Sequence, residues 1–207
     1  MASEIVALVD YGAGNLRSVE NALRAAGAGA IAVTADPAVV CAADRVVLPG
    51  VGAFASCMGA LSAIDGMIAA MDEAVHQRGV PFLGICVGMQ LLADAGHEYG
   101  RHPGLGWIGG DVRLMRPADP KLKIPHMGWN DVRATGSHPL LLPGEAYYLH
   151  SYAFDVADPA DVLATTEHGM PVTAAVGRGN VIGVQFHPEK SQAYGLAFLA
   201  RFLAWRP

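Results

Sequence analysis

Short apolar runs alternate with helical patterns through the first half of the chain. The runs predict buried strands at residues 4–9, 30–34, 45–48 and 80–85. Between them, apolar residues recur every three or four positions, which predicts helices opened by Asn15 and by Asp36, a longer helix over residues 64–78, and another over 88–93. Strands and helices that alternate in this way form a parallel sheet covered on both faces.

The second half of the chain has a different pattern. Strand-length segments occur at residues 109–115, 130–134, 146–156, 162–166, 171–177 and 180–186, separated by turn residues. The Gly-Arg-Gly-Asn sequence at 177–180 is typical of a hairpin turn, and a helix over 192–205 closes the chain. We therefore predict an α/β fold: one domain over residues 1–207, with a mainly parallel central sheet flanked by helices and an additional antiparallel region in the second half.

Composition and charge exclude several kinds of partner. The net charge is −5 and the basic residues are scattered singly, so we expect neither a nucleic-acid partner nor an anionic membrane surface. The first residues lack the basic start of a secretory signal, and no uninterrupted apolar stretch reaches the ~18 residues of a membrane span. We expect a cytoplasmic protein.

Three cysteines, an odd number, do not suggest a disulfide framework. Cys41 and Cys57 stand in small apolar contexts, where a buried packing role is expected. Cysteine and histidine show no close pairs with the spacing of metal ligands, so we expect no metal.

Cys86 differs because a buried strand runs through Gly84-Ile85-Cys86-Val87-Gly88 directly into a helix. This Gly-x-Cys-x-Gly pattern is typical of a nucleophile elbow, in which small neighbours permit a strained turn that exposes the nucleophile. The start of the following helix favours the thiolate form. The alternative is a buried cysteine between packing glycines, but the strand–turn–helix context favours a nucleophile.

A thiol nucleophile needs a base, and the sequence offers His187 for that role. An apolar strand ends at His187, and Glu189 lies two residues further, so it reaches the same side of an extended chain. A carboxylate there orients the imidazole, as the third member of a catalytic triad does. The alternative is an isolated histidine at a turn, which the presence of Cys86 disfavours.

Backbone N–H groups are the expected donors to the oxyanion of a tetrahedral intermediate. The N–H of Val87 is one, and the turn formed by Gly50, Val51 and Gly52 offers another. An ordinary strand-to-helix turn remains the alternative for the Gly50–Gly52 segment.

These motifs resemble those of the class I (triad) glutamine amidotransferases. The similarity covers residues 84–90, around the cysteine, and the Phe-His-Pro-Glu sequence at 186–189. Segments 10–15, 49–52, 125–130 and 147–152 extend it, and they resemble those members of the family that serve a separate synthase subunit. The resemblance runs from about residue 5 to the last helix. Val87 stands where relatives often carry leucine, which is harmless because only its backbone is needed.

The resemblance implies glutamine as the substrate, a Cys86 thioester as the intermediate, and no cofactor. Cys86, His187 and Glu189 would be the catalytic triad. Substrate-binding residues by position would be Gln90, Glu98, His150, Ser151 and Tyr152.

The resemblance also implies a partner, a (β/α)8 barrel synthase subunit that receives ammonia in a 1:1 heterodimer. Residues expected at that interface are Asn15, Met127, Trp129, Asn130 and Lys190. For Met127 and Trp129 the alternative is packing in the core.

Other interpretations are weaker. Gly12-Ala13-Gly14 after a strand suggests a dinucleotide fingerprint, but Arg17 stands where a third glycine belongs. A cysteine hydrolase or peptidase with the same elbow, another biosynthetic amidotransferase, and a catalytically silent binding subunit all stay open. The intact Cys86, His187 and Glu189 disfavour the last of these.

Overall fold

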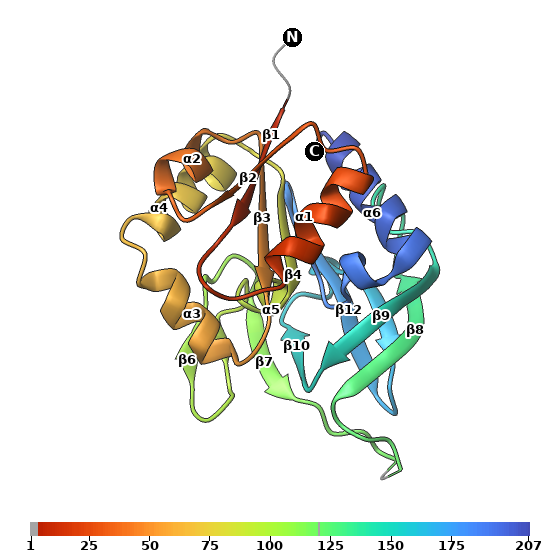
Figure 1. Cartoon of the computed structure of the whole chain (residues 1–207). Helices are drawn as coiled ribbons and strands as arrows, with labels where there is room; N and C mark the ends of the chain where they lie inside the picture. Colours follow the sequence, from red (N-terminus) through yellow and green to blue (C-terminus); the bar gives the residue numbers. More distant parts are fainter. Residues whose placement is uncertain (1–3, 120) are drawn as a thin grey trace.

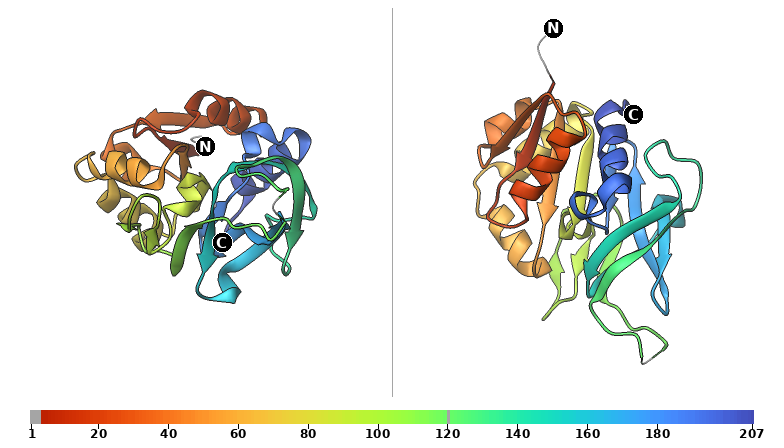
Figure 2. Two further views of the ribbon diagram at one scale, coloured as in Figure 1. Left: turned by 90° about the horizontal axis from the view of Figure 1, so that it is seen from below. Right: turned by 45° about the vertical axis from the view of Figure 1, so that its right-hand side comes forward.

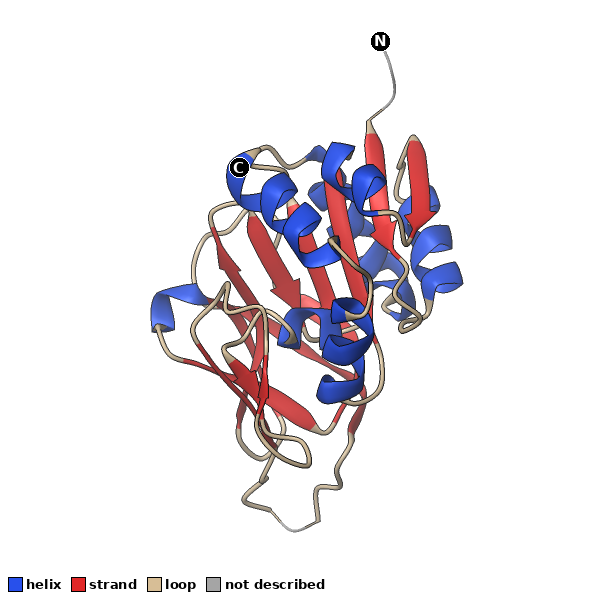
Figure 3. Ribbon diagram, turned by 90° about the vertical axis from the view of Figure 1, so that its left-hand side faces the viewer, coloured by secondary structure: helices blue, strands red, loops and turns tan. Residues whose placement is uncertain are grey.

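The computed structural model describes residues 4–119 and 121–207, and it confirms the predicted α/β architecture. Over those residues the strands form two sheets. The larger has nine strands in the order β2-β1-β3-β4-β13-β12-β11-β8-β9, and the smaller has four in the order β10-β7-β5-β6. Helices cover the parallel part of the larger sheet, whereas the other half of the molecule consists mainly of strands and loops (Figures 1 and 3).

The parallel part of the larger sheet contains the four strands predicted in the first half of the chain. Its members are β2 (Ala30–Thr34), β1 (Ile5–Val9), β3 (Arg45–Gly50), β4 (Phe82–Cys86) and β13 (Val181–Val184). Strands β3 and β4 are buried along their whole lengths, as expected for a sheet covered on both faces. The bounds of the first four strands agree with the predicted ones to within two residues.

Helices pack on both faces of this sheet. Helix α1 (Leu16–Ala25) lies against α6 (Gln192–Ala204) on one face, and α2 (Pro37–Ala42) lies against α4 (Met67–Asp72) on the other (Figure 1). Asn15 Oδ1 accepts a hydrogen bond from the Ser18 N–H (3.4 Å), and Asp36 Oδ1 accepts one from the Ala38 N–H (2.9 Å). Both predicted helix starts are therefore confirmed, because each cap satisfies an otherwise free N–H of the first turn.

The predicted helix over residues 64–78 is wrong in its bounds. The chain forms α3 (Phe54–Ser62), which was not predicted, and then α4, which continues as a π-helical turn over Glu73–Gln77. Gly66, at φ +77°, precedes α4 and separates the two helices, because this left-handed conformation interrupts a helix.

The cysteines outside the elbow differ from one another. Cys57 on α3 is buried, as predicted, but Cys41 on α2 is only half-buried, so the prediction of burial is wrong there. In the short helix α2 the buried residue is Val40 rather than Cys41. Among the described residues all three cysteines are free thiols.

The antiparallel region predicted in the second half extends the larger sheet beyond β13 (Figure 2). It consists of β12 (Pro171–Arg178), β11 (Val162–Glu167), β8 (His126–Ala134) and β9 (Gly144–His150). The predicted hairpin joins β12 to β13, with Gly179 at φ +58°. Strand β8 begins four residues before its predicted start at Asn130, because residues 126–129 also pair with β9.

The single strand predicted over residues 146–156 is two strands. The chain leaves β9 at His150, turns at Ser151 and enters β10 (Tyr152–Val156), which belongs to the smaller sheet. That sheet also contains β7 (Gly110–Leu114) and the two-residue strands β5 (Ala95–Gly96) and β6 (His102–Pro103), neither of which was predicted.

The carboxyl ends of three strands meet at the centre of the larger sheet. Gly50, the last residue of β3, pairs with Cys86, the last residue of β4, and β13 runs parallel on the other side. Helix α5 (Val87–Gln90) follows β4 at once and is shorter than the predicted 88–93. Ligands of open α/β sheets bind at this edge.

No single helix among the described residues is long and apolar enough to cross a membrane. One bent pair, Phe54–Ser62 with Met67–Gln77, meets the length and composition criteria together, at an angle of 92°.

Candidate active site

A sharp turn between β4 and α5 carries Cys86. Its backbone has φ 54° and ψ −110°, a conformation that residues with a side chain rarely adopt. A Cβ at Gly84 would lie 2.6 Å from the Gly88 carbonyl oxygen, and a Cβ at Gly88 would overlap the Leu48 carbonyl oxygen. The strained turn therefore needs glycine on both sides of Cys86, as the Gly-x-Cys-x-Gly pattern predicts.

His187 follows β13 and precedes the 3-10 turn Pro188–Lys190. Its Nδ1 lies 2.8 Å from Glu189 Oε1, and the two side chains are only 3% and 2% exposed. The backbone is fixed as well: the His187 N–H donates to the Tyr147 carbonyl (2.9 Å), and Ser191 Oγ donates to the His187 carbonyl (2.7 Å). The ring therefore has one orientation, set by Glu189.

The electrostatics of His187 connect it to Cys86. Burial alone would lower the pKa of His187, but hydrogen bonds to Cys86 and Glu189 and the charges of these two groups raise it to about 10. A thiol, an imidazole and a carboxylate thus lie in series, although they come from β4 and from the chain after β13. This is the arrangement of a nucleophile, a base and an orienting group.

Two buried glutamines stand beside the thiol. Gln185 Nε2 lies 3.6 Å from Cys86 Sγ, and Gln90 Nε2 donates to Gln185 Oε1 (2.9 Å) and to the Tyr152 carbonyl (3.0 Å). Gln185 was not predicted as a site residue. The available signal was its position two residues before His187, which places both side chains on one side of an extended chain.

A cavity of about 140 Å³ opens over Cys86. It is lined by Val51, Gly52, Cys86, Val87, Gln90, Glu98, Leu149, His150, Ser151, Tyr152, His187 and Lys190. This brings together the predicted nucleophile, base and substrate-binding residues, with part of the predicted oxyanion turn. Gly50 and Glu189 are not in the lining: Gly50 packs against α5, and Glu189 bonds to His187.

Both carbonyls that flank Gly50 are hydrogen-bonded. The Tyr11 hydroxyl donates to the Pro49 carbonyl (2.6 Å), and the Cys57 thiol donates to the Val51 carbonyl (3.3 Å). Gly52 has φ +99°, which favours glycine. Tyr11 and Cys57 were not predicted to contribute to the site, because only the tertiary structure brings them to this turn.

The family model for "Glutamine amidotransferase class-I" matches residues 7–204, nearly the whole chain. The chain belongs to the class-I glutamine amidotransferases. The predicted family resemblance is therefore confirmed, and the protein is an enzyme subunit of that family.

Two curated relatives are similar to this amidotransferase along almost all of its length. One, from Zymomonas mobilis, is 66% identical over 100% of this chain and 98% of its own, and the other, from Rhodospirillum rubrum, is 60% identical over 98% and 99%. Both carry the name "Imidazole glycerol phosphate synthase subunit HisH". Among solved structures, PurLQS from Thermotoga maritima has the same fold, with a TM-score of 0.70, 18% identity and coverage of 98% of this chain and 97% of that one.

Glu98 and His150 of this amidotransferase face the cavity but already have partners in the chain. Glu98 Oε2 accepts a hydrogen bond from the Phe54 N–H at the start of α3 (3.0 Å). His150 Nδ1 lies 2.8 Å from the Tyr152 carbonyl, and burial lowers the pKa of this histidine to about 3. His150 is therefore neutral at pH 7.

The five predicted interface residues differ in their exposure and in their contacts. Met127 and Trp129 are 64% and 47% exposed on β8, so core packing is excluded for both. Lys190 lines the cavity, and its ammonium lies over the Tyr147 ring (5.9 Å). Asn15 is exposed and caps α1, whereas Asn130 directs its amide inward, toward His126 and the Glu167 carbonyl.

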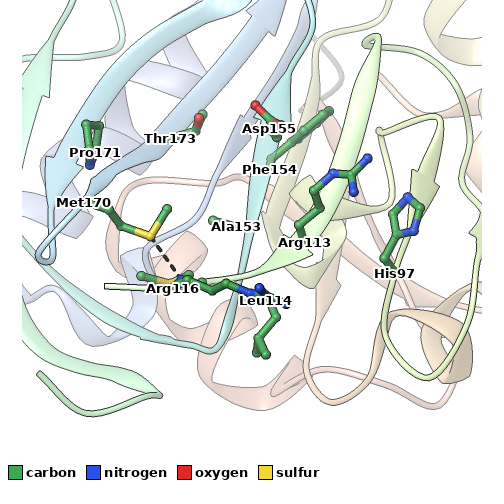
Figure 4. Close-up of a pocket in the computed structure, with 11 residues that line it drawn as sticks. His97, Arg113, Leu114, Arg116, Ala153, Phe154, Asp155, Met170, Pro171 and Thr173 are labelled. Carbon is green, nitrogen blue, oxygen red and sulfur yellow. Dashed lines mark hydrogen bonds between the residues drawn. The ribbon is translucent and has the colours of Figure 1, made fainter. Parts of the chain in front are cut away.

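A larger cavity of this amidotransferase lies elsewhere, between β12 and the strands β7 and β10 (Figure 4). Its volume is about 660 Å³, and it is lined by Arg113, Arg116, Met170 and His97 among others. No cysteine lines it, and Arg113 and His97 both contact Asp111 instead of converging on a ligand position. The smaller cavity over Cys86 is thus the candidate active site. Among the described residues, no group of His, Cys, Asp and Glu is placed to hold a metal ion.

Proposed function

We propose that the chain is the glutaminase subunit of an imidazole glycerol phosphate synthase. It would hydrolyse glutamine to glutamate and ammonia through a Cys86 thioester. The ammonia would pass to a synthase subunit that makes imidazole glycerol phosphate and an aminoimidazole carboxamide ribonucleotide in histidine biosynthesis. The identity with relatives of that name over the full chain supports the proposal. The observation that carries it is the single cavity that unites Cys86 with His187, which Glu189 holds at 2.8 Å.

In the proposed reaction, Cys86 Sγ gives its proton to His187 and attacks the side-chain amide carbon of glutamine, which forms a tetrahedral intermediate. The N–H of Val87 and an N–H of the Gly50–Val51–Gly52 turn hold the oxyanion. His187 protonates the departing nitrogen, so the carbon–nitrogen bond breaks, ammonia leaves and a thioester remains. His187 then takes a proton from water as the water attacks the thioester, and it returns that proton to the departing sulfur, which releases glutamate and restores the thiol.

Cavity size and polarity support an amino acid as the substrate. About 140 Å³ is well below the several hundred Å³ of pockets that hold larger ligands. Gln90 and Glu98 would face the amino-acid end of glutamine, and the backbone of residues 150–152 would form the opposite wall. The carboxylate of Glu98 is the natural partner for the substrate's ammonium group.

A second subunit is needed because ammonia in neutral water is mostly protonated and then is no nucleophile. We propose a (β/α)8 barrel subunit bound as a 1:1 heterodimer at the edge of the sheet where the active site lies. Met127 and Trp129 would be its apolar anchors, with Asn15, Asn130 and Lys190 nearby. Three statements about the amidotransferase chain itself stay predictions: that it is cytoplasmic, that it has no nucleic-acid or membrane partner, and that residues 1–207 form one domain. Four of those residues lie outside the described part.

The oxyanion turn is the proposed point of control by the partner. We infer that the Gly50–Val51 peptide reorients on activation, so that its N–H completes the oxyanion hole. Replacing Gly50 with alanine or proline should impair stimulated turnover far more than glutamine binding. However, a Cβ at Gly50 would lie 2.7 Å from the Gly88 nitrogen, so alanine also disturbs the elbow. The hydrogen bond from Cys57 to the Val51 carbonyl gives a cleaner test, described in the Discussion.

The deciding experiment is a glutaminase assay of the purified chain, alone and with the barrel subunit plus its nucleotide ligand. We expect release of glutamate and ammonia that rises strongly in the complex and disappears in Cys86→Ala. A cysteine peptidase would instead cleave peptides and ignore free glutamine. A silent binding subunit would leave the ammonia release of a Cys86→Ala complex equal to that of the wild-type complex, and either result would overturn the proposal.

A further inference from the structure

A buried chain of hydrogen bonds connects strand β8 to the wall of the active-site cavity. Asn130 Nδ2 lies 3.0 Å from His126 Nε2, His126 Nδ1 lies 3.1 Å from His150 Nε2, and His150 Nδ1 lies 2.8 Å from the Tyr152 carbonyl. His126 and His150 are 3% and 6% exposed, and they face each other as paired residues of β8 and β9.

The groups at the two ends of this hydrogen-bond chain, the Tyr152 carbonyl and the Asn130 amide, decide which atom donates in every bond. A carbonyl oxygen can only accept, so His150 Nδ1 carries a proton and, in a neutral ring, Nε2 is a bare acceptor. His126 Nδ1 must then donate to it, which leaves His126 Nε2 as an acceptor for the Asn130 amide. That amide is itself fixed, because Nδ2 also donates to the Glu167 carbonyl (2.8 Å) and Oδ1 accepts from the Asp131 N–H (2.8 Å).

The environment of the two rings keeps them neutral and in place. Burial lowers the pKa of His126 to about 4, with a further contribution from His168, and burial likewise lowers that of His150 to about 3. The His126 ring is stacked between Tyr148 and His168, at centroid distances of 4.8 and 4.3 Å. Stacking fixes the plane of the ring, and the hydrogen bonds fix its rotation within that plane.

The hydrogen-bond chain ends at the active-site cavity. The Tyr152 carbonyl oxygen accepts hydrogen bonds from both His150 Nδ1 and Gln90 Nε2, so both of its lone pairs are used. The segment held in this way includes Leu149, whose carbonyl is 3.9 Å from Cys86 Sγ. Its position therefore decides the width of the cavity opposite the nucleophile.

We propose that His126 is a positioning residue for the glutamine site: by donating to His150 it selects the tautomer that holds the Tyr152 carbonyl and the cavity wall. The inference rests on the proposed function for its substrate. Met127 and Trp129 lie close to His126 on the same strand. The hydrogen-bond chain therefore also connects the proposed docking strand to the cavity.

The test compares two substitutions of His126 in the complex with the barrel subunit. His126→Asn keeps an amide N–H close to the place of ring Nδ1, whereas His126→Leu removes the donor. We expect KM for glutamine to rise about tenfold in His126→Leu, as for the loss of one buried hydrogen bond, with kcat changed less. His126→Asn should restore most of the loss. His76→Leu is the control, because it removes an exposed histidine of the π-helical turn that takes no part in the hydrogen-bond chain or the ring stack, and it should stay within about twofold of wild type.

A second measurement does not depend on the reaction. In ¹⁵N-histidine NMR spectra of the wild-type chain, His126 and His150 should both be protonated at Nδ1 and bare at Nε2. An Nε2-protonated His150 would overturn the proposal, as would equal KM values in His126→Leu and wild type or equal losses in His126→Leu and His126→Asn. If His126→Leu does not fold, the spectra and the His126→Asn variant decide. If the wild-type complex fails to hydrolyse glutamine, the proposed function is wrong, and the spectra alone still decide the hydrogen-bond chain.

Discussion

At the scale of single residues, the histidines of this chain fall into two groups according to what surrounds them. His187 has a carboxylate and a thiol as partners, which outweigh burial and raise its pKa to about 10. The hydrogen-bond partners of His126 and His150 carry no charge, so burial dominates and lowers their pKa values, with smaller contributions from neighbouring histidines. The same side chain is therefore protonated at pH 7 in one place and neutral in the other.

Glu189→Gln separates the orienting role of the carboxylate from its charge. The amide can still bond to His187 Nδ1, but it cannot stabilise the imidazolium, so the pKa of His187 should fall. We expect kcat for glutamine to drop by at least about 100-fold with little change in KM, since the comparable change in serine proteases costs more. Steady-state kinetics and an NMR titration of His187 check this. Glu73→Gln, on the exposed side of the π-helical turn, is the matched control, and an unchanged kcat in Glu189→Gln would contradict the proposed role.

Stability in mild acid should depend on the buried neutral histidines. Their pKa values are lower in the folded chain than the usual 6.5, so below that pH the unfolded chain binds more protons and the free energy of unfolding decreases. The loss should begin near pH 6.5 and continue as the pH falls toward 4; His138, whose pKa burial also lowers, adds to it. Urea unfolding of wild type and His126→Asn between pH 7 and 5 measures this. The slope against pH should be smaller in the variant, and equal slopes would be evidence against a neutral buried His126.

At the scale of elements, close approach between β3, β4 and α5 positions Cys86. Gly84, Gly88 and Gly50 allow backbone to lie against backbone, so the sulfur is fixed by packing that no larger residue permits. Tyr11 and Cys57 then hold the turn after β3 from the outside.

Gly88→Ala tests this packing. The new Cβ would overlap the Leu48 carbonyl oxygen, so we expect a loss of about 3 kcal/mol or more in the free energy of unfolding, and the loss of glutaminase activity. The control is Gly59→Ala on the exposed side of α3, where nothing lies within 4 Å of the added Cβ. That change should stabilise by about 0.5–1 kcal/mol, because alanine favours a helix interior more than glycine does. Denaturant unfolding measures both, and similar effects of the two changes would refute the steric account.

Cys57→Ala tests control at the oxyanion turn. Without the thiol the Val51 carbonyl loses its donor, so the neighbouring peptide reorients more easily. We expect the basal glutaminase rate of the isolated chain to rise several-fold, because one lost hydrogen bond corresponds to about 1 kcal/mol. The stimulated rate should change little, so the ratio of the two decreases. Cys41→Ala, at a half-buried site away from the turn, should leave that ratio as it is, and a ratio unchanged in Cys57→Ala would argue against control at this turn.

At the scale of the whole molecule, the sequence was informative where local pattern decides the structure. The strands β1 to β4 follow from continuous apolar runs, and the elbow follows from glycines around Cys86. The break at Ser151 was not predictable, because strand-forming residues continue on both sides of it and only the pairing partners differ. The His126–His150 contact and the roles of Gln185 and Cys57 were missed for the same reason: each depends on strand register or on the packing of α3, which local sequence does not specify.

The large sheet also sets where a partner can dock, because β8, next to the edge strand β9, presents the exposed Met127 and Trp129 and also carries the buried His126. Trp129→Ala should weaken binding of the barrel subunit by about 2 kcal/mol, roughly a 30-fold rise in Kd, as expected for an aromatic anchor. Val33→Ala removes a comparably exposed apolar side chain (40% against 47%) from β2, at the opposite end of the sheet order, and should leave Kd unchanged. Titration calorimetry of each variant with the barrel subunit distinguishes the two surfaces. Basal glutaminase activity of isolated Trp129→Ala should match wild type, since the side chain does not line the cavity. A Kd that rises in Val33→Ala but not in Trp129→Ala would place the docking surface at the β2 end of the sheet, away from the hydrogen-bond chain.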